Sequence, residues 1–325
     1  MELDLLKKFS RTKILIIGDV MLDHYVMGSV TRISPEAPVP VLLKESEHYY
    51  LGGAGNVFSN IHSLGGNGDI LTVTGNDLNG ELVKNMVKEK SSLSMLIKTD
   101  KRRTTIKSRY LGNSHQLLRV DDEDCDDIDN ETENYFIDLL ESAVEFYECV
   151  IIEDYNKGLM TPRIIRRTIE LCNAKNKPVI VDPKVKNIDF YKGCTVLKPN
   201  FSEFCTIAGK KISVSDHDQI TVEARKILDQ MEIKGILVTL SDKGMLYVTK
   251  YESYYSPGYL INVSDVSGAG DTVTAMFSLC ISSGVDIKKT LKLCNIAGSI
   301  ACSLVGAVSV NLTEILESRY FKSNP

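Results

Sequence analysis

The stretch ECVIIEDYNKGLMTPRIIRRTIELCNAKNKPVIVD, residues 148–182, decides the fold class. The apolar run 148–154 predicts a buried strand, residues 161–175 predict a helix, and the apolar run 177–182 predicts a second strand. A strand, a crossover helix and a strand in this order build a parallel sheet with helices on both of its faces. The stretch therefore predicts an α/β fold with a mostly parallel central sheet.

The same alternation continues on both sides of this stretch. Residues 244–250 and 252–258 predict a hairpin at a sheet edge, and the acidic run 121–133 predicts a solvated loop. We expect a single domain over residues 1–325. The other predicted strands lie at 13–20, 69–75, 103–111, 115–120, 194–200 and 235–240, and the other predicted helices at 57–65, 77–90, 201–209, 219–231, 271–283 and 286–304.

One segment does not follow this alternation of strands and helices. Residues 26–53 contain short alternating pieces and three prolines. Together with 98–120 they predict a small β-strand lid that projects from the main domain, and the alternative is an ordinary surface excursion. A lid strand standing alone would leave unpaired edges, so we expect two copies of the chain to pair through it as a homodimer.

Composition narrows the class of protein. The chain has 325 residues, 43% of them hydrophobic and 25% charged, which suits a globular protein with a sizeable core. A net charge of −5 argues against general nucleic-acid binding. The eight cysteines form no C-x-x-C pair, which favours reduced thiols. No apolar run is long enough for a membrane helix and the N-terminus does not read as a leader peptide, so we expect a cytoplasmic protein.

The stretch DVSGAGDT, residues 265–272, carries the clearest chemical signal. Its glycine turn precedes a predicted helix, and the free amides at a helix N-terminus bind anions such as phosphate. Asp271 would add a negative charge beside that anion, which makes sense if its carboxylate takes a proton from an attacking hydroxyl. The alternative is that Asp271 only caps the helix. The chain has no G-x-x-x-x-G-K-[ST] motif, which excludes a P-loop enzyme.

Further polar residues stand at predicted strand ends. Asp19 and Asp23 follow the first strand, and the glycine turn GGAGN, 52–56, precedes a helix. Their carboxylates and amide suit sugar hydroxyls, although a turn with a helix cap explains 52–56 equally well. Asn200 and Glu203 have the spacing of a capping pair, and they also suit a site for metal-bound water.

One predicted strand carries several basic residues. Arg103, Lys107 and Arg109 alternate, so they point to one side of a strand and would face one anion. More often, such residues form a solvated strand face.

Taken together, these motifs resemble the ribokinase-type (PfkB) carbohydrate kinases along the whole chain. GGAGNV and DVSGAGDT match the two signatures of that family, and KPNFSE matches its N-x-x-E motif. Within the family, RISPEAPVPV in the lid, EDYNKG and VDPK are most similar to the bacterial heptose-7-phosphate kinases. Gly55 and Phe58 stand where those kinases usually carry alanines.

The resemblance implies a ribokinase-like fold and a role for each matching residue. Asp271 would be the catalytic base, and the amides of Gly268, Ala269 and Gly270 would hold the transferring phosphoryl group. Glu203 would position Mg²⁺ through water. The expected contacts of the sugar phosphate are Asp19, Asp23, Gly52, Gly53, Asn56, Lys107, Arg109, Lys157 and Lys184, with Lys107 or Arg109 on the 7-phosphate. The expected contacts of ATP are Asn200, Glu203, Thr239, Ser241, Gly244 and Asn295.

The implied activity is ATP-dependent phosphorylation of the C1 hydroxyl of D-glycero-β-D-manno-heptose 7-phosphate, on the route to ADP-heptose and the lipopolysaccharide core. Two alternatives stay open: a kinase of the same fold for another sugar or sugar phosphate, and a non-catalytic sugar- or nucleotide-binding module. The chain has no H-x-G-H motif, so we expect no nucleotidyl-transfer activity in it.

Overall fold

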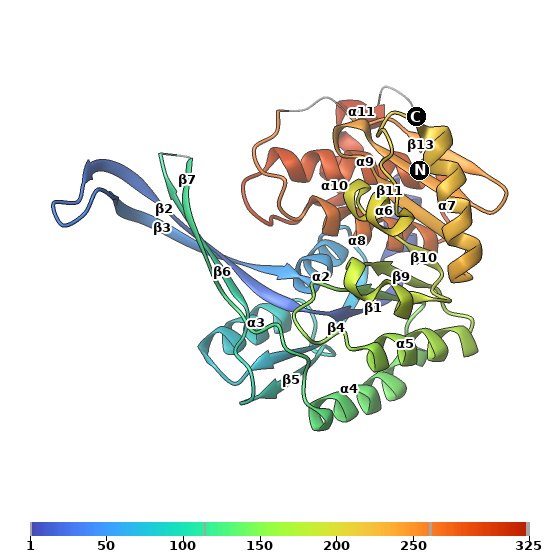
Figure 1. Cartoon of the computed structure of the whole chain (residues 1–325), viewed down its shortest axis with the longest axis horizontal. Helices are drawn as coiled ribbons and strands as arrows, with labels where there is room; N and C mark the ends of the chain where they lie inside the picture. Colours follow the sequence, from blue (N-terminus) through green and yellow to red (C-terminus); the bar gives the residue numbers. More distant parts are fainter. Residues whose placement is uncertain (1, 114, 260–261, 323–325) are drawn as a thin grey trace.

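A large, mostly parallel sheet forms the centre of the molecule (Figure 1). The computed structural model describes residues 2–113, 115–259 and 262–322, and within these ranges nine strands join in the order β13-β12-β11-β10-β9-β8-β1-β4-β5. The pairs β11–β12 and β12–β13 are antiparallel, and β12 with β13 forms the predicted edge hairpin. The strands are β1 (Lys13–Gly18), β4 (Asn67–Gly75), β5 (Met95–Thr99), β8 (Cys149–Glu153), β9 (Val179–Asp182), β10 (Val196–Leu197), β11 (Gly235–Thr239), β12 (Met245–Thr249) and β13 (Ser253–Ser256).

Helices cover both faces of this sheet, and β1 shows why. Successive side chains of a strand point to opposite faces. Ile14 and Ile16 belong to one buried apolar cluster, whereas Leu15 and Ile17 belong to the other. The first cluster includes residues of α2 (Ala54–Ser63), α3 (Leu78–Lys88), α8 (Ala269–Ser282), α9 (Ile287–Ser303), α10 (Leu312–Glu317) and α11 (Arg319–Lys322); the second includes residues of α4 (Asn130–Ala143), α5 (Pro162–Ala174), α6 (Phe201–Ala208) and α7 (His217–Met231). The predicted α/β class with helices on both faces is confirmed.

A small second sheet projects from this body as a long arm (Figure 1). In the described part of the chain it contains four strands in the order β3-β2-β6-β7. Its strands are β2 (Val20–Ile33), β3 (Pro40–Gly53), β6 (Ile106–Gly112) and β7 (His115–Asp122). The arm therefore begins nearer the N-terminus than residue 26. Lys98 and Thr99 end β5 of the main sheet instead, and Ser114 lies outside the described residues.

Four α-helices in the described part of the chain were not predicted from the sequence, and two of them, α10 and α11, follow the last predicted helix. α1 (Glu2–Phe9) precedes the first strand, and α4 begins inside the acidic run 121–133. The prediction of a solvated loop over this whole run is therefore wrong. Asp129 is the N-cap of α4, and its carboxylate accepts hydrogen bonds from the N–H groups of Glu131 and Thr132. Acids are favourable at this end of a helix because they complement its dipole.

Candidate active site

Asp271 lies at the start of α8, beside the glycine turn. Gly268 is the N-cap residue with φ 76°, a left-handed conformation that glycine adopts at no steric cost. The Asp271 side chain is 4% exposed and does not cap the helix. Its Oδ2 accepts a hydrogen bond from Asn56 Nδ2 at 2.7 Å, and its Oδ1 accepts one from the Tyr155 hydroxyl at 2.6 Å. The helix-cap alternative therefore does not describe this carboxylate, which turns toward α2 and the loop after β8.

The surroundings of Asp271 shift the pKa of its carboxyl group. Burial raises the pKa of Asp271 to about 6, while the hydrogen bonds from Tyr155 and Asn56 oppose that rise. A carboxylate with a pKa close to the working pH is well suited to accept a proton from a hydroxyl. The environment of Asp271 therefore matches the chemistry expected of a general base.

A charged cluster, in which Glu153 and Lys198 are buried and Asp182 is partly buried, lies next to Asp271 at the carboxyl ends of three strands. It contains Glu153 of β8, Asp182 of β9 and Lys198 just after β10. The Lys198 ammonium is 2.7 Å from Asp182 Oδ2, and burial alone would lower its pKa, but Asp182 and Glu153 outweigh that effect and raise the pKa. Neither oxygen of Glu153 has a hydrogen-bond partner. These three residues were missed because each is a single polar residue at the end of an apolar run.

The turn GGAGN brings Asn56 to the Asp271 carboxylate. Gly53 has φ 58°, and a Cβ there would lie 2.4 Å from the Asp19 carbonyl oxygen. A Cβ on Gly52 would lie 2.2 Å from Asp23 Oδ2, so the turn packs directly on the start of the arm. Asn56 is in the first turn of α2, and its amide group points at Asp271. The structure thus joins the two glycine motifs, although they are far apart in the sequence.

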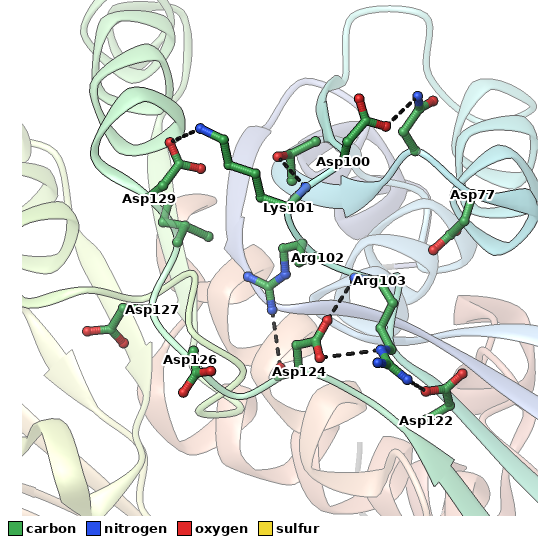
Figure 2. A pocket seen from close by; sticks show the side chains of 13 residues that line it. Asp77, Asp100, Lys101, Arg102, Arg103, Asp122, Asp124, Asp126, Asp127 and Asp129 are labelled. Atoms are coloured by element: carbon green, nitrogen blue, oxygen red, sulfur yellow. Dashed lines mark hydrogen bonds and ion pairs between the residues drawn. The ribbon is translucent and has the colours of Figure 1, made fainter.

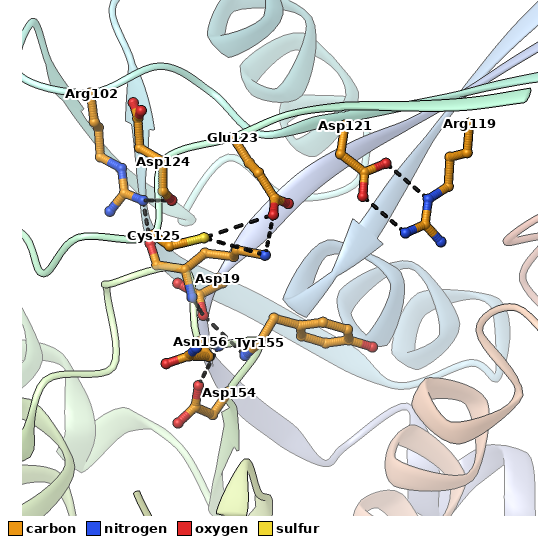
Figure 3. A network of polar contacts seen from close by, with 11 residues as sticks. Asp19, Arg102, Arg119, Asp121, Glu123, Asp124, Cys125, Asp154, Tyr155 and Asn156 are labelled. Atoms are coloured by element: carbon orange, nitrogen blue, oxygen red, sulfur yellow. Dashed lines mark hydrogen bonds and ion pairs between the residues drawn. The ribbon is translucent and has the colours of Figure 1, made fainter. Parts of the chain in front are cut away.

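The two aspartates after β1 have different surroundings. Asp19 accepts hydrogen bonds from the backbone N–H groups of Tyr155, Lys157 and Leu159, at 3.0, 3.1 and 3.2 Å. Figure 3 shows Asp19 beside Tyr155 in this network. Both oxygens of Asp19 are therefore engaged in holding the loop after β8. Asp23 forms an ion pair with Arg109 inside the arm, where both side chains are mostly buried.

The predicted cations do not share one environment. The ammonium groups of Lys184 and Lys107 lie 5.1 Å and 6.0 Å from the centre of the Tyr155 ring. Lys157 forms an ion pair with Glu123 at 2.6 Å. Arg103 lies before β6 and pairs with two aspartates, Asp122 and Asp124, so it does not face the same anion as Lys107.

Asn200 and Glu203 form a capping box at the N-terminus of α6. Asn200 Oδ1 accepts from the Glu203 N–H at 2.9 Å, and Glu203 Oε2 accepts from the Asn200 N–H at 3.0 Å. Glu203 Oε1 is 3.3 Å from the Lys184 ammonium. The capping alternative is present in the structure, and it still leaves one carboxylate oxygen directed at Lys184.

The residues expected to contact ATP form one connected edge beyond β10 and β11. Thr239 forms an isolated bridge with Asn200. Asn295 Nδ2 donates to the Ser256 carbonyl oxygen at 3.0 Å, and a Cβ on Gly244 would lie 2.1 Å from that same oxygen. Ser241 begins the short 3-10 turn that leads to Gly244. Thr239, Ser241, Gly244 and Asn295 therefore lie close together.

A hollow beside the start of α3 and α4 is lined by acids and by three cations (Figure 2). Most of its charged side chains are paired with each other or cap helices. Lys101 contacts Asp129, Arg103 contacts Asp122 and Asp124, and Asp77 is the N-cap of α3. This hollow does not include Asp271 or its partners.

No helix in the described ranges is long and apolar enough to span a membrane.

Comparisons of the sequence identify the family. Residues 11–314 match the profile of the pfkB family of carbohydrate kinases. The "Bifunctional protein HldE" of Caulobacter sp. (strain K31) is 37% identical over 314 residues, which are 95% of this chain and 63% of that protein. The protein of the same name from Aliarcobacter butzleri (strain RM4018) is 35% identical, over 97% of this chain and 66% of its own length. The chain thus spans about two thirds of the length of these curated relatives.

Solved structures show the same fold. Phosphofructokinase-2 from Escherichia coli, in complex with substrates and products, superposes with a TM-score of 0.77 at 16% identity, covering 94% of this chain and 97% of that one. Ribokinase from Arabidopsis thaliana, in complex with ribose and ATP, superposes with a TM-score of 0.71 at 17% identity, covering 94% and 99%. The fold is therefore ribokinase-like, and the chain belongs to the pfkB family of carbohydrate kinases and is a sugar kinase.

Proposed function

We propose that the chain transfers the γ-phosphoryl group of ATP to the C1 hydroxyl of D-glycero-β-D-manno-heptose 7-phosphate, in the synthesis of ADP-heptose for lipopolysaccharide. The observation that carries the proposal is the buried Asp271 carboxylate beside the glycine turn, held from two sides by Asn56 and Tyr155. The choice of heptose rests on the sequence of the arm, RISPEAPVPV, and on similarity to the HldE proteins.

In the proposed reaction, Asp271 accepts the proton of the C1 hydroxyl while that oxygen forms a bond to the γ-phosphorus. The bond between the γ-phosphorus and the bridging oxygen of ATP breaks, and ADP leaves with the electron pair. The N–H groups of Gly268, Ala269 and Gly270 at the start of α8 stabilise the charge on the transferring group. The protein supplies positioning and electrostatics, which is most of what phosphoryl transfer needs.

Mg²⁺ fits the residues present on one side of this site. Glu203 Oε1 is not used in the capping box, so it would hold the ion through water, next to Lys184. When bound, the ion neutralises charge on the ATP phosphates. Thr239, Ser241, Gly244 and Asn295 would line the nucleotide edge.

The substrate's own phosphate needs a cation, and the structure favours Lys107 over Arg109. Arg109 is already paired with Asp23. Among the described residues, the Lys107 ammonium has no ion-pair partner, and burial together with the nearby Lys157 lowers its pKa. Lys107→Ala should therefore raise KM for the phosphorylated sugar far more than KM for ATP. Lys101→Ala is the matched control, because Lys101 pairs with Asp129 away from Asp271. Equal changes in both KM values would refute this assignment.

A panel of sugars tests the reaction itself. ADP release is measured with Mg-ATP and heptose 7-phosphate, unphosphorylated heptose, fructose phosphates or ribose, with Asp271→Asn as the control. We expect turnover on the heptose phosphate alone, reduced about 10²- to 10⁴-fold in the variant. Turnover on another sugar would support the kinase activity and show that heptose 7-phosphate is not the substrate. ATP binding without any turnover would favour a binding module.

We further propose that two copies of the chain pair through the arm. Its strands expose large apolar side chains, including Ile33 (61%), Leu118 (56%) and Val120 (46%). Such residues on sheet strands are a ready surface for pairing. Light scattering at micromolar concentration should give a dimer, and Leu118→Glu should shift it toward the monomer. A monomeric parent protein would refute the proposal.

A further inference from the structure

The loop directly after β8 places Tyr155 against the catalytic carboxylate. The N–H of Tyr155 donates to Asp19 at 3.0 Å, and the N–H groups of Lys157 and Leu159 donate to the same carboxylate. Three backbone hydrogen bonds to one buried acid fix the path of this loop. The position of the Tyr155 side chain is therefore set by the main chain around it.

The Tyr155 side chain connects the reacting centre with both candidate phosphate sites. Its hydroxyl donates to Asp271 Oδ1 at 2.6 Å, and the ammonium groups of Lys184 and Lys107 lie 5.1 Å and 6.0 Å from the centre of its ring. Lys184 is on the side of Glu203, where the ATP phosphates are expected, and Lys107 is on the arm. Nothing in the proposed proton transfer uses the phenol itself.

The second donor to Asp271 explains why a phenol at this position is useful. A carboxylate held only through Oδ2 by Asn56 could still turn about its side-chain bonds. A second hydrogen bond, at Oδ1, fixes the plane of the group and leaves free lone pairs pointing in one direction. Catalysis depends steeply on such alignment between a base and the proton that it accepts.

We propose that Tyr155 is a positioning residue for phosphoryl transfer, whose hydroxyl locks the orientation of the Asp271 carboxylate. This inference rests on the proposed role of Asp271 as the base. Since Tyr155 acts through Asp271, its hydroxyl should affect kcat and leave substrate binding almost unchanged.

Tyr155→Phe keeps the ring and removes only the hydroxyl. We expect kcat to fall about 10- to 100-fold, the range for a lost hydrogen bond to a charged group, with KM for ATP and for the sugar phosphate within about twofold. Tyr25→Phe is the matched control, because the Tyr25 hydroxyl donates to Asp265 at 3.5 Å and not to Asp271. That variant should keep kcat. A thermal melt checks folding, and Tyr155→Met replaces the first variant if it is unstable.

A double-mutant cycle decides whether Tyr155 acts through Asp271. In an Asp271→Asn background, adding Tyr155→Phe should leave the residual rate unchanged. An equal fold-loss in both backgrounds, or a loss confined to KM, would overturn the inference. If Asp271→Asn alone kept near-normal kcat, the proposed base would fail first, so the two failures can be told apart.

Discussion

Replacing Glu153 with Gln should stabilise the protein at neutral and alkaline pH. Glu153 is 0% exposed, and neither of its carboxylate oxygens has a hydrogen-bond partner. Burial, and then the charges of Asp182 and Asp271, raise the pKa of Glu153 well above its ordinary value of 4.5. The folded protein therefore keeps a proton on Glu153 over a pH range in which the unfolded chain has lost it.

The sign and size of the effect follow from proton linkage. Below about pH 4.5 Glu153 is protonated in both the folded and the unfolded state, so its ionisation does not lower the free energy of unfolding. As pH rises from there through the folded pKa, the free energy of unfolding falls by up to about 1.4 kcal/mol per pH unit. Gln has nearly the shape of the protonated acid and does not titrate. The stability difference in favour of Glu153→Gln should therefore widen with pH at up to that slope.

Urea unfolding of both proteins between pH 5.5 and 8.5 measures this difference. The buffers should contain EDTA, because oxygens of Glu153, Asp182 and Asp271 lie within 4.8 Å of one another and could take up a metal ion. Glu317→Gln, on an exposed side chain of α10, is the control and should give no pH-dependent difference. If the free energies of unfolding of the wild type and of Glu153→Gln changed with pH in parallel, the argument would be refuted. A wild type that gains on the variant as pH rises would show that Glu153 is ionised and paired with Lys198.

Three predictions concern catalysis. Because Asp271 must be ionised to accept a proton and its pKa is raised to about 6, kcat/KM should rise with pH through that value, as a pH–rate profile would show. Asn56→Ala removes a hydrogen bond that lowers the pKa of Asp271, so the acidic limb of the same profile should move to higher pH. Gly268→Ala forces a side chain into a φ of 76° with its Cβ 2.4 Å from Asn56 Nδ2. Its kcat should fall by roughly 10²- to 10³-fold, as when an anion-binding donor is lost, while circular dichroism stays unchanged.

Local patterns were sufficient to predict most of the fold. β1, β8 and β9 are short apolar runs bounded by polar residues, and the hydrophobic effect leaves such runs few alternatives to a buried strand. The start of α4 was hidden because its N-cap, Asp129, lies within a run of acids that by charge alone predicts a loop.

The candidate site was harder to predict, because its contacts join distant elements. Asp271 and the glycine turns have a local signature, whereas Tyr155 and Lys198 do not. Their proximity depends on the neighbouring order β8-β9-β10 and on the course of one loop, which a single sequence does not give. One signal was available: polar residues directly after parallel strands gather at the ligand-binding edge, and EDY, VD and LK all stand there.

Glu203 shows how one residue can satisfy the fold and the chemistry together. Its Oε2 completes the capping box with Asn200, and its Oε1 faces Lys184. Glu203→Gln retains an oxygen for the cap, so the free energy of unfolding should change by less than about 0.5 kcal/mol, whereas Glu203→Ala should lose about 1 kcal/mol.

Removing the charge of Glu203 should nevertheless raise the Mg²⁺ concentration needed for half-maximal rate, and titration of activity with Mg²⁺ would measure this. If the Gln variant kept the wild-type Mg²⁺ dependence, Glu203 would serve the helix alone. If both variants lost Mg²⁺ affinity equally and only Ala lost stability, the cap and the metal site would be separate functions of the two oxygens of one carboxylate. The second outcome is the one that the geometry supports, because the oxygen that the helix does not use is the one that faces Lys184.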